Sequence, residues 1–214
     1  MSSLLTDTRL RVGCVGGGQL GRMMALEAPR LNISMSFLDP LGSDAPAADS
    51  SSSVIQGSLC DPEKLRELAS NVDVVTIEIE HVGVDALETL ENEGVNVQPS
   101  SRVVRIIQDK YAQKKHFSEH KIPLPPFHET PNIESIKLAA IEFGLPLMLK
   151  SRLGAYDGRG NAVLNSTDDD SILLALKSLG CNSDTTTNLP LYAEAWMDFY
   201  CEIAVIVVRS SKTG

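Results

Sequence analysis

The stretch RVGCVGGGQLG at residues 11–21 decides the fold of the first half of the chain. Its first five residues are apolar enough to predict a buried strand, and a helical pattern at 20–31 follows directly after three glycines. Residues 33–38 predict a second strand, which ends at Asp39. Strand, glycine turn, helix and strand in this order are typical of a βαβ unit with parallel strands.

Strands and helices continue to alternate beyond this unit. Asp61 followed by Pro62 predicts a helix start, because a carboxylate suits the N-cap position and proline suits the first turn. A strand at 72–79, a helix at 85–93 and a short strand at 95–97 are predicted after it. We therefore expect an α/β fold in which a Rossmann-like parallel sheet carries helices on its faces.

A second part of the chain is predicted after residues 121–127, which contain three prolines in seven residues and follow a helical pattern at 101–120. We expect the first domain to comprise residues 1–120. In the second part the pattern predicts helices at 132–143 and 168–179 and strands at 147–150, 161–164, 191–194 and 200–209.

The last predicted strand, at 200–209, indicates whether the chain is a whole protein or part of one. Residues 203–208 are apolar on both faces, which is typical of a central strand with a neighbour on each side. Only a turn-like segment follows, and an unpaired apolar edge would favour aggregation. We therefore expect the chain to be a fragment of a longer one. The alternative is that upstream strands supply both neighbours.

Composition and charge narrow the classes of function. The chain has 214 residues, 43% hydrophobic and 22% charged, which is ordinary for a globular protein with a sizeable core. Its 19 Lys and Arg against 28 Asp and Glu give a net charge of -9, which disfavours nucleic acid and anionic membranes as partners. No apolar run suits a signal peptide or a transmembrane helix, so a cytoplasmic protein is expected. Cys14 and Cys201 lie in apolar runs and are expected to be buried thiols.

The first glycine motif predicts a site for a phosphate-bearing ligand. Residues 16–21 match G-x-G-x-x-G, and Asp39 lies about twenty residues further on, as in dinucleotide-binding proteins. This motif alone leaves an NAD(P)-dependent oxidoreductase open as an alternative. Glu78 and Glu80 share one face at the end of the strand predicted at 72–79, where either could hold ribose hydroxyls or a substrate amine.

A second glycine-rich segment, GAYDGRGN at residues 154–161, follows the strand that ends in Lys150. Its three glycines permit a loop that can close over phosphates, and Lys150, Arg152 and Arg159 supply positive charge. Asp157 beside them could orient a substrate amine or a basic side chain. A plain glycine-rich hairpin would not need this charge.

The segment YAEAWM at residues 192–197 suits a hinge that offers its backbone to an adenine edge while Trp196 and Met197 pack against the ring. Glu202, on the next predicted strand, could hold a ribose. Taken alone, this segment favours ordinary core over a binding hinge.

Five segments together resemble the ATP-grasp 5-(carboxyamino)imidazole ribonucleotide synthetases, in particular the form that begins the fungal bifunctional phosphoribosylaminoimidazole carboxylase. They are GGGQLGRM at 16–23, TIEIEHV at 76–82, QDKYAQK at 108–114, KSRLGAYDGRGN at 150–161 and YAEAW at 192–196.

This resemblance implies a Rossmann-like pre-ATP-grasp domain at 1–120, a small ATP-grasp subdomain at 121–190 and the opening strands of a large, incomplete subdomain at 191–214. It implies a ligase of purine biosynthesis that carboxylates 5-aminoimidazole ribonucleotide with ATP and bicarbonate, and a homo-oligomeric full-length enzyme. The Mg²⁺ ligands would lie beyond residue 214, so no metal site and no turnover are expected from this chain alone. A non-catalytic nucleotide-binding fragment remains a second alternative.

The resemblance also assigns roles to individual residues. Asp157 and Arg159 would be the catalytic residues near the reacting amine. The residues expected to bind the ribonucleotide are Gly18, Gln19, Leu20, Glu78 and Tyr156. The residues expected to bind ATP are Lys110, Lys150, Tyr156, Asp157, Gly158, Arg159, Gly160, Asn161, Glu194, Ala195, Trp196, Met197 and Glu202.

Overall fold

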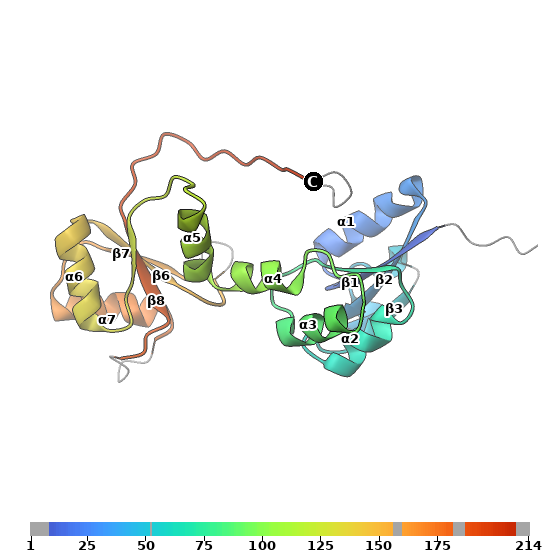
Figure 1. The fold of residues 1–214 in the computed structure, drawn as a ribbon. Helices are drawn as coiled ribbons and strands as arrows, with labels where there is room; N and C mark the ends of the chain where they lie inside the picture. The colour runs from blue at the N-terminus through green and yellow to red at the C-terminus, as the bar shows by residue number, and fades with distance from the viewer. Residues whose placement is uncertain (1–8, 52, 156–159, 182–186, 209–214) are drawn as a thin grey trace, which may run out of the picture. The chain divides into compact units, whose positions relative to one another are not determined.

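The computed structural model describes residues 9–51, 53–155, 160–181 and 187–208 (Figure 1). The chain forms two compact units. The first comprises Met1–Ile122 together with Arg152–Gly154, and the second comprises Pro123–Ser151 and Ala155–Gly214. The α/β class expected from the sequence is confirmed, with one four-stranded sheet in each unit. The division of the second part at residue 190 stays a prediction.

The sheet of the first unit is parallel, in the order β3-β2-β1-β4. Its strands are β1 (Leu10–Val15), β2 (Ile33–Asp39), β3 (Ser53–Gln56) and β4 (Val74–Ile77). The sequence pattern did not predict β3, because its four residues are only half-buried or exposed and show no clear alternation. The short strand expected at 95–97 is a single bridge between Val75 and Val97.

Helices cover both faces of this sheet (Figure 1). They are α1 (Gln19–Glu27) on one face and α2 (Pro62–Ala69) and α3 (Val84–Asn92) on the other; α4 (Ser101–Gln108) adds Val104 to the core of α2 and α3, and α5 (Lys110–Glu119) follows without joining the core of this sheet. Cys14 and Phe37 face α1 in one apolar cluster, whereas Val15 and Leu38 belong to a second cluster with α2 and α3. This alternation along β1 and β2 is the period of two that a strand buried on both faces requires.

The single helix predicted at 101–120 is in fact two helices, α4 and α5, separated at Asp109. The Asp109 backbone is extended (φ -107°, ψ 104°), and its side chain accepts hydrogen bonds from the N–H groups of Tyr111 and Ala112. A carboxylate in this position caps a new helix, which is why the helical pattern of the sequence continues while the backbone turns.

The sheet of the second unit is antiparallel, in the order β5-β8-β6-β7. Its strands are β5 (Phe127–Glu129), β6 (Leu147–Ser151), β7 (Asn161–Leu164) and β8 (Leu191–Ala195), and its helices are α6 (Ile133–Phe143) and α7 (Asp169–Ser178). The core between the helices and the sheet is built from apolar side chains that include Ile136, Leu149, Leu164, Ile172 and Leu176.

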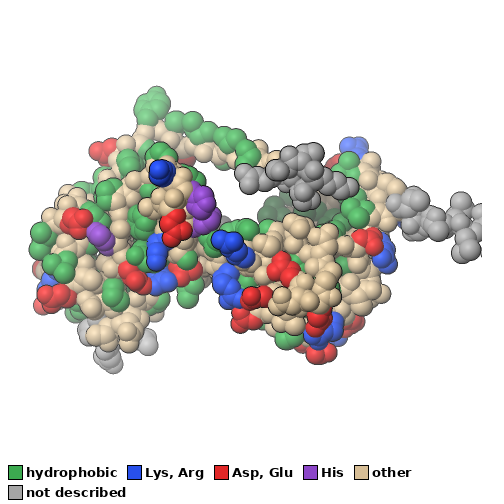
Figure 2. Space-filling model, in the orientation of Figure 1, with side chains coloured by type: hydrophobic (Ala, Val, Ile, Leu, Met, Phe, Trp, Pro, Cys, Tyr) green, Lys and Arg blue, Asp and Glu red, His purple; other side chains and the backbone are tan. Residues whose placement is uncertain are grey.

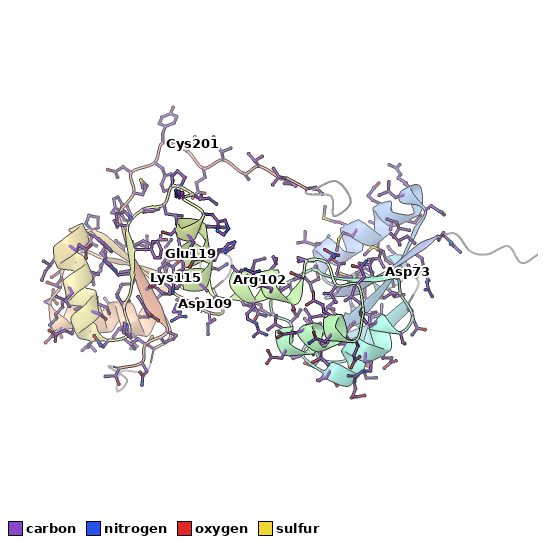
Figure 3. The ribbon with its side chains drawn as sticks, in the orientation of Figure 1. Asp73, Arg102, Asp109, Lys115, Glu119 and Cys201 are labelled. Carbon is purple, nitrogen blue, oxygen red and sulfur yellow. The ribbon has the colours of Figure 1, made fainter. Side chains whose placement is uncertain are left out.

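The strand predicted at 200–209 is absent from its described part, residues 200–208. Strand β8 is already paired with β5 on one side and β6 on the other, so the chain that follows has no free edge of β8 to join. Its apolar side chains are exposed (Figure 2). Ile206, for example, is 95% exposed. Cys201 lies on this segment (Figure 3) and is exposed, so the expectation of a buried thiol was wrong there, whereas Cys14 is fully buried.

In the described part of the chain, no helix is long and apolar enough to span a membrane.

Candidate functional site

The glycine turn between β1 and α1 is held in place by the acid at the end of β2. Asp39 Oδ2 accepts a hydrogen bond from the N–H of Gly17 at 2.9 Å, and Asp39 Oδ1 accepts one from the N–H of Leu41 at 2.9 Å. The Asp39 residue is only 8% exposed. Its carboxylate therefore serves the backbone of the turn, whereas in a dinucleotide-binding fold the equivalent acid binds a ribose.

A second carboxylate, that of Glu78, lies against the same turn. Glu78 Oε2 accepts from the N–H of Gly18 at 2.8 Å, and Oε1 accepts from the N–H of Gly21 at 3.0 Å. A Cβ atom at Gly18 would lie 2.8 Å from Glu78 Oε1, so any side chain there would displace the carboxylate. Glu78 thus occupies part of the positive N-terminal end of α1.

Two donors at this helix end stay available. Gln19 and Leu20 are exposed, and their backbone N–H groups have no hydrogen-bond partner within the described residues. The first N–H groups of a helix have no partner inside the helix and readily bind an anion. These two predicted ribonucleotide-binding residues therefore present the remaining donors of the turn.

The buried thiol beneath this turn stays protonated. Burial, and then the negative charge of Glu78, raise the pKa of Cys14 to about 12. Cys14 Sγ lies 3.4 Å from the carbonyl oxygen of Gly16, to which it donates. This thiol therefore has a structural role and is no nucleophile at neutral pH.

The turn that follows β4 is fixed by a residue whose role the sequence did not reveal. Gln108 Nε2 donates to the carbonyl oxygens of Glu80 at 2.7 Å and Val82 at 2.9 Å. Gln108 belongs to the QDKYAQK segment, so the resemblance marked its position without indicating what it does.

The next two residues of that segment contact the stretch Arg152–Gly154. The N–H of Lys110 donates to the carbonyl oxygen of Arg152 at 2.8 Å. Asp109, shown at the start of α5 in Figure 3, accepts hydrogen bonds from the Arg152 guanidinium through both carboxylate oxygens. The guanidinium carbon also lies 5.2 Å from the centre of the Tyr111 ring. Burial raises the pKa of Asp109, but the hydrogen bonds from Arg152, Ala112 and Tyr111 outweigh it and lower the pKa below its usual value.

In the second unit, two predicted ATP-binding residues form an ion pair. Lys150 Nζ lies 2.6 Å from Glu194 Oε2, and their side chains are 27% and 6% exposed. They come from the neighbouring strands β6 and β8, on which Lys150 is paired with Tyr192 and Glu194 with Met148. This diagonal arrangement on one face of an antiparallel pair brings the two long side chains within reach.

The predicted adenine hinge follows at the end of β8. The N–H of Ala195 donates at 2.9 Å to the carbonyl oxygen of Pro126, the residue before β5. Trp196 and Met197 are 44% and 49% exposed, and their backbone groups have no hydrogen-bond partner among the described residues. The residues therefore fit a flat ligand that needs one donor and one acceptor from the backbone.

The remaining predicted residues divide into three groups. Tyr156, Asp157, Gly158 and Arg159 lie outside the described residues. Gly160 (φ +79°) accepts from the N–H of Ser151 at 2.8 Å and closes the base of the loop, while Asn161 begins β7 opposite Lys150. Glu202 lies on the exposed segment after β8, where no described strand holds it.

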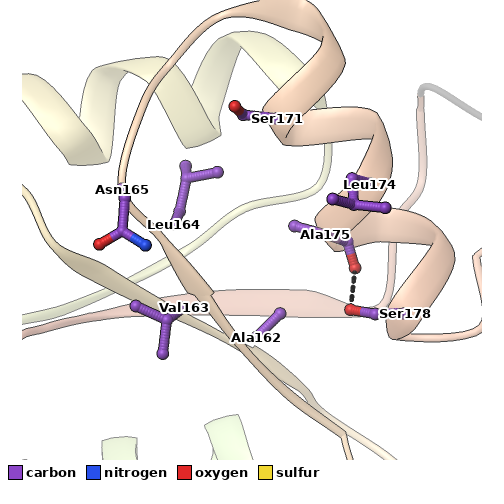
Figure 4. A pocket seen from close by; sticks show the side chains of 8 residues that line it. All are labelled: Ala162, Val163, Leu164, Asn165, Ser171, Leu174, Ala175 and Ser178. Carbon is purple, nitrogen blue, oxygen red and sulfur yellow. Dashed lines mark hydrogen bonds between the residues drawn. The ribbon is translucent and has the colours of Figure 1, made fainter.

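Two cavities lie elsewhere. One of about 340 Å³, between β7 and α7 (Figure 4), is lined by Ala162, Val163, Leu164, Asn165, Ser171, Leu174, Ala175 and Ser178, none of which is charged. The other, of about 300 Å³, lies at the start of β2, at the strand end away from Asp39. Neither contains a predicted site residue. Within the described ranges, no three His, Cys, Asp or Glu side chains come together to hold a metal ion.

Family models identify both parts of the chain. Residues 10–108 match the ribonucleotide synthetase preATP-grasp domain, and residues 115–214 match the ATP-grasp domain. The chain belongs to the ribonucleotide synthetase family of ATP-grasp proteins. The resemblance drawn from the five segments is thereby confirmed.

Individual members of this family cover most of the chain. The phosphoribosylaminoimidazole carboxylase of Schizosaccharomyces pombe is 45% identical over 199 residues, which are 93% of this chain and 34% of that protein. The carboxyaminoimidazole ribonucleotide synthase of Aspergillus clavatus complexed with ATP is 40% identical, with a TM-score of 0.78 over 91% of this chain and 49% of that one. The N5-carboxyaminoimidazole synthase of Aspergillus clavatus in complex with ADP and 5-aminoimidazole ribonucleotide is 38% identical to this chain. Its TM-score is 0.77 over 91% of this chain and 48% of that one. The ATP-grasp chain thus spans a third to a half of the length of these relatives.

Proposed function

We propose that this chain binds ATP and 5-aminoimidazole ribonucleotide and forms the first part of a synthetase that carboxylates this ribonucleotide. The observation that carries the proposal is the similarity, over most of the chain, to a synthase structure that contains ADP and the same ribonucleotide. Purine biosynthesis is the process in which the homologues act.

The chemistry has two steps. Bicarbonate attacks the γ-phosphorus of ATP, which releases ADP and forms carboxyphosphate. The exocyclic amine of the ribonucleotide then attacks the carboxyl carbon, loses a proton and expels inorganic phosphate. Positioning and neutralisation of charge supply most of the rate in such phosphoryl transfers.

The glycine turn supports binding of the ribonucleotide. The N–H groups of Gln19 and Leu20 would donate to the ligand phosphate at the start of α1, and Gly18 keeps this surface free of a side chain. The Glu78 carboxylate already accepts two N–H groups, but its two oxygens offer about four lone-pair positions and can also accept a ribose hydroxyl.

The end of β8 supports binding of ATP. The backbone of Ala195, Trp196 and Met197 would bind the adenine edge. Lys150 would contact the ATP phosphates. To do so, its ammonium group must either leave the Glu194 carboxylate or bind the carboxylate and a phosphate oxygen at the same time. A cation that is already held in a fixed position needs little further ordering when the nucleotide arrives.

Other roles remain part of the proposal. Lys110 would contact the ATP phosphates, and Asp157 and Arg159 would orient the amine. Magnesium, when bound, would neutralise the phosphate oxygens. Its protein ligands are expected beyond residue 214. A homo-oligomeric parent protein stays a prediction.

Calorimetric titration of the purified chain with each ligand tests the proposal. Mg-ATP and 5-aminoimidazole ribonucleotide should each bind with a stoichiometry of about one, and a ligand at 100 times its Kd should add about 2.7 kcal/mol to stability. NAD⁺ should give no heat of binding. Binding of NAD⁺ alone would favour the oxidoreductase, and a folded chain that binds neither ATP nor the ribonucleotide would contradict the proposal.

A further inference from the structure

The start of α5 is joined to Arg152 by a backbone hydrogen bond and a ring contact in addition to an ion pair. The carbonyl oxygen of Arg152 accepts from the N–H of Lys110, and its guanidinium donates to both carboxylate oxygens of Asp109. The guanidinium carbon lies over the Tyr111 ring, 5.2 Å from its centre. The carboxylate of Asp109 also caps α5. Backbone and side chain of Arg152 thus hold the same helix end from two directions.

We infer that Asp109 and Arg152 are a positioning pair, which holds the backbone of Lys110 so that its ammonium group is presented to a nucleotide phosphate. This inference rests on the proposed function, in which Lys110 contacts ATP. It gives the QDK sequence a division of roles: Gln108 fixes the turn after β4, Asp109 fixes the helix start, and Lys110 carries the charge that contacts the ligand.

Burial separates this pair from the other two-pronged pairs of the first unit, Arg11–Asp73 and Arg66–Glu93, whose side chains are 39% to 55% exposed. The side chains of Arg152 and Asp109 are 27% and 19% exposed, whereas Arg105 is 51% exposed and its partners Asp85 and Glu88 are more exposed still. A two-pronged guanidinium–carboxylate contact away from water fixes both partners far better than an exposed pair does. Lysine could not replace the arginine, because it cannot bind both oxygens in a fixed plane.

The charged partners of Arg152 and Lys110 indicate that Arg152 acts on the ligand only by positioning Lys110. The sequence suggested that Arg152 adds positive charge for phosphates, but its guanidinium is compensated by Asp109 and lies beside the Tyr111 ring. Lys110 makes no ion pair among the described residues and is half-buried at the first position of α5. No described carboxylate therefore compensates its ammonium group, while its backbone is fixed by the carbonyl oxygen of Arg152.

Two substitutions separate these roles. Asp109→Asn keeps a side-chain oxygen that can cap α5 but removes the charge, and Arg152→Ala removes the guanidinium but keeps the carbonyl oxygen. Each should speed hydrogen exchange of the Lys110 amide by about tenfold, because local opening becomes easier. Arg105→Ala, which removes an exposed pair of the same unit, should leave this amide unchanged.

Affinity for ATP relative to adenosine gives the second readout. Both variants should weaken ATP binding by about tenfold and leave adenosine binding within about twofold, and the double variant should be no weaker than the poorer single one. Loss of ATP affinity in Arg152→Ala but not in Asp109→Asn would mean that Arg152 contacts the phosphate directly. Unchanged exchange of the Lys110 amide in both variants would overturn the inference, whether or not the wild-type chain binds ATP. If the amide exchanges faster in the variants but the wild-type chain does not bind ATP, the result counts against the proposed function and not against the positioning pair.

Discussion

At the scale of single residues, the glycine turn is shaped by two carboxylates that the sequence assigned to ligands. Asp39 was the acid that kept an NAD-binding fold open, yet it accepts hydrogen bonds from Gly17 and Leu41 and is almost completely buried. Glu78 accepts hydrogen bonds from Gly18 and Gly21. The residue types and spacing of a dinucleotide fold are present, but a pattern of letters does not show which way a carboxylate points.

Gly18→Ala tests the arrangement at Glu78. The backbone φ of -72° suits alanine, so the change acts only through its Cβ atom, 2.8 Å from the Glu78 carboxylate. The carboxylate must move, and we expect ribonucleotide affinity to fall by about tenfold, or 1.4 kcal/mol, while ATP affinity is unchanged. Calorimetry measures both. Gly94→Ala is the control: its φ of +91° makes alanine strain the backbone there, but no atom lies within 4 Å of the added Cβ, so it should affect neither affinity.

Lys150→Met tests the buried ion pair of the second unit. The substitution removes the ammonium group that lies 2.6 Å from the buried Glu194 carboxylate, 6% exposed, and should lower the free energy of unfolding by about 3 kcal/mol in denaturant titrations. Lys137→Met is the matched control, because its pair with Asp169 is exposed and should contribute at most about 1 kcal/mol. Equal losses in the two variants would show that Lys150 and Glu194 are no closer partners than a surface pair.

At the scale of elements, the sequence predicted what short-range patterns determine. Apolar runs and caps correctly predicted β1, β2, β6 and the start of α2 at Asp61. Strands β3 and β5 were missed, because each is a strand only through hydrogen bonds to a distant neighbour. The same dependence on partners explains why residues 200–208, although rich in β-branched residues, form no strand.

The cap of α7 makes a prediction about pH. Hydrogen bonds from the Ser166 hydroxyl and then from the N–H and hydroxyl of Ser171 lower the pKa of Asp168 from 3.8 to about 2. Because the pKa in the folded state is depressed, the stabilisation is complete above pH 4 and is lost as the pH falls towards 2. A carboxyl NMR titration should show this value, and Ser166→Ala should raise it. An ordinary value for Asp168 in the unsubstituted chain would contradict this account of the cap.

At the scale of the whole molecule, each compact unit contains part of the predicted site. The first unit has the glycine turn with the exposed residues Gln19 and Leu20, and the second has the Lys150–Glu194 pair with the end of β8. The short motifs predicted these residues because each combines charge or glycine with a strand end. The contacts of Gln108, Asp109 and Arg152 could not be predicted, since they join segments that are distant in sequence.

Hydrogen exchange of the chain with and without 5-aminoimidazole ribonucleotide tests the central claim most directly. The N–H groups of Gln19 and Leu20 should exchange at least about tenfold more slowly with the ribonucleotide, since they would then be bonded to its phosphate. Mg-ATP should instead protect Trp196 and Met197, and NAD⁺ should protect neither pair. Protection of Gln19 and Leu20 by NAD⁺ but not by the ribonucleotide would contradict the account.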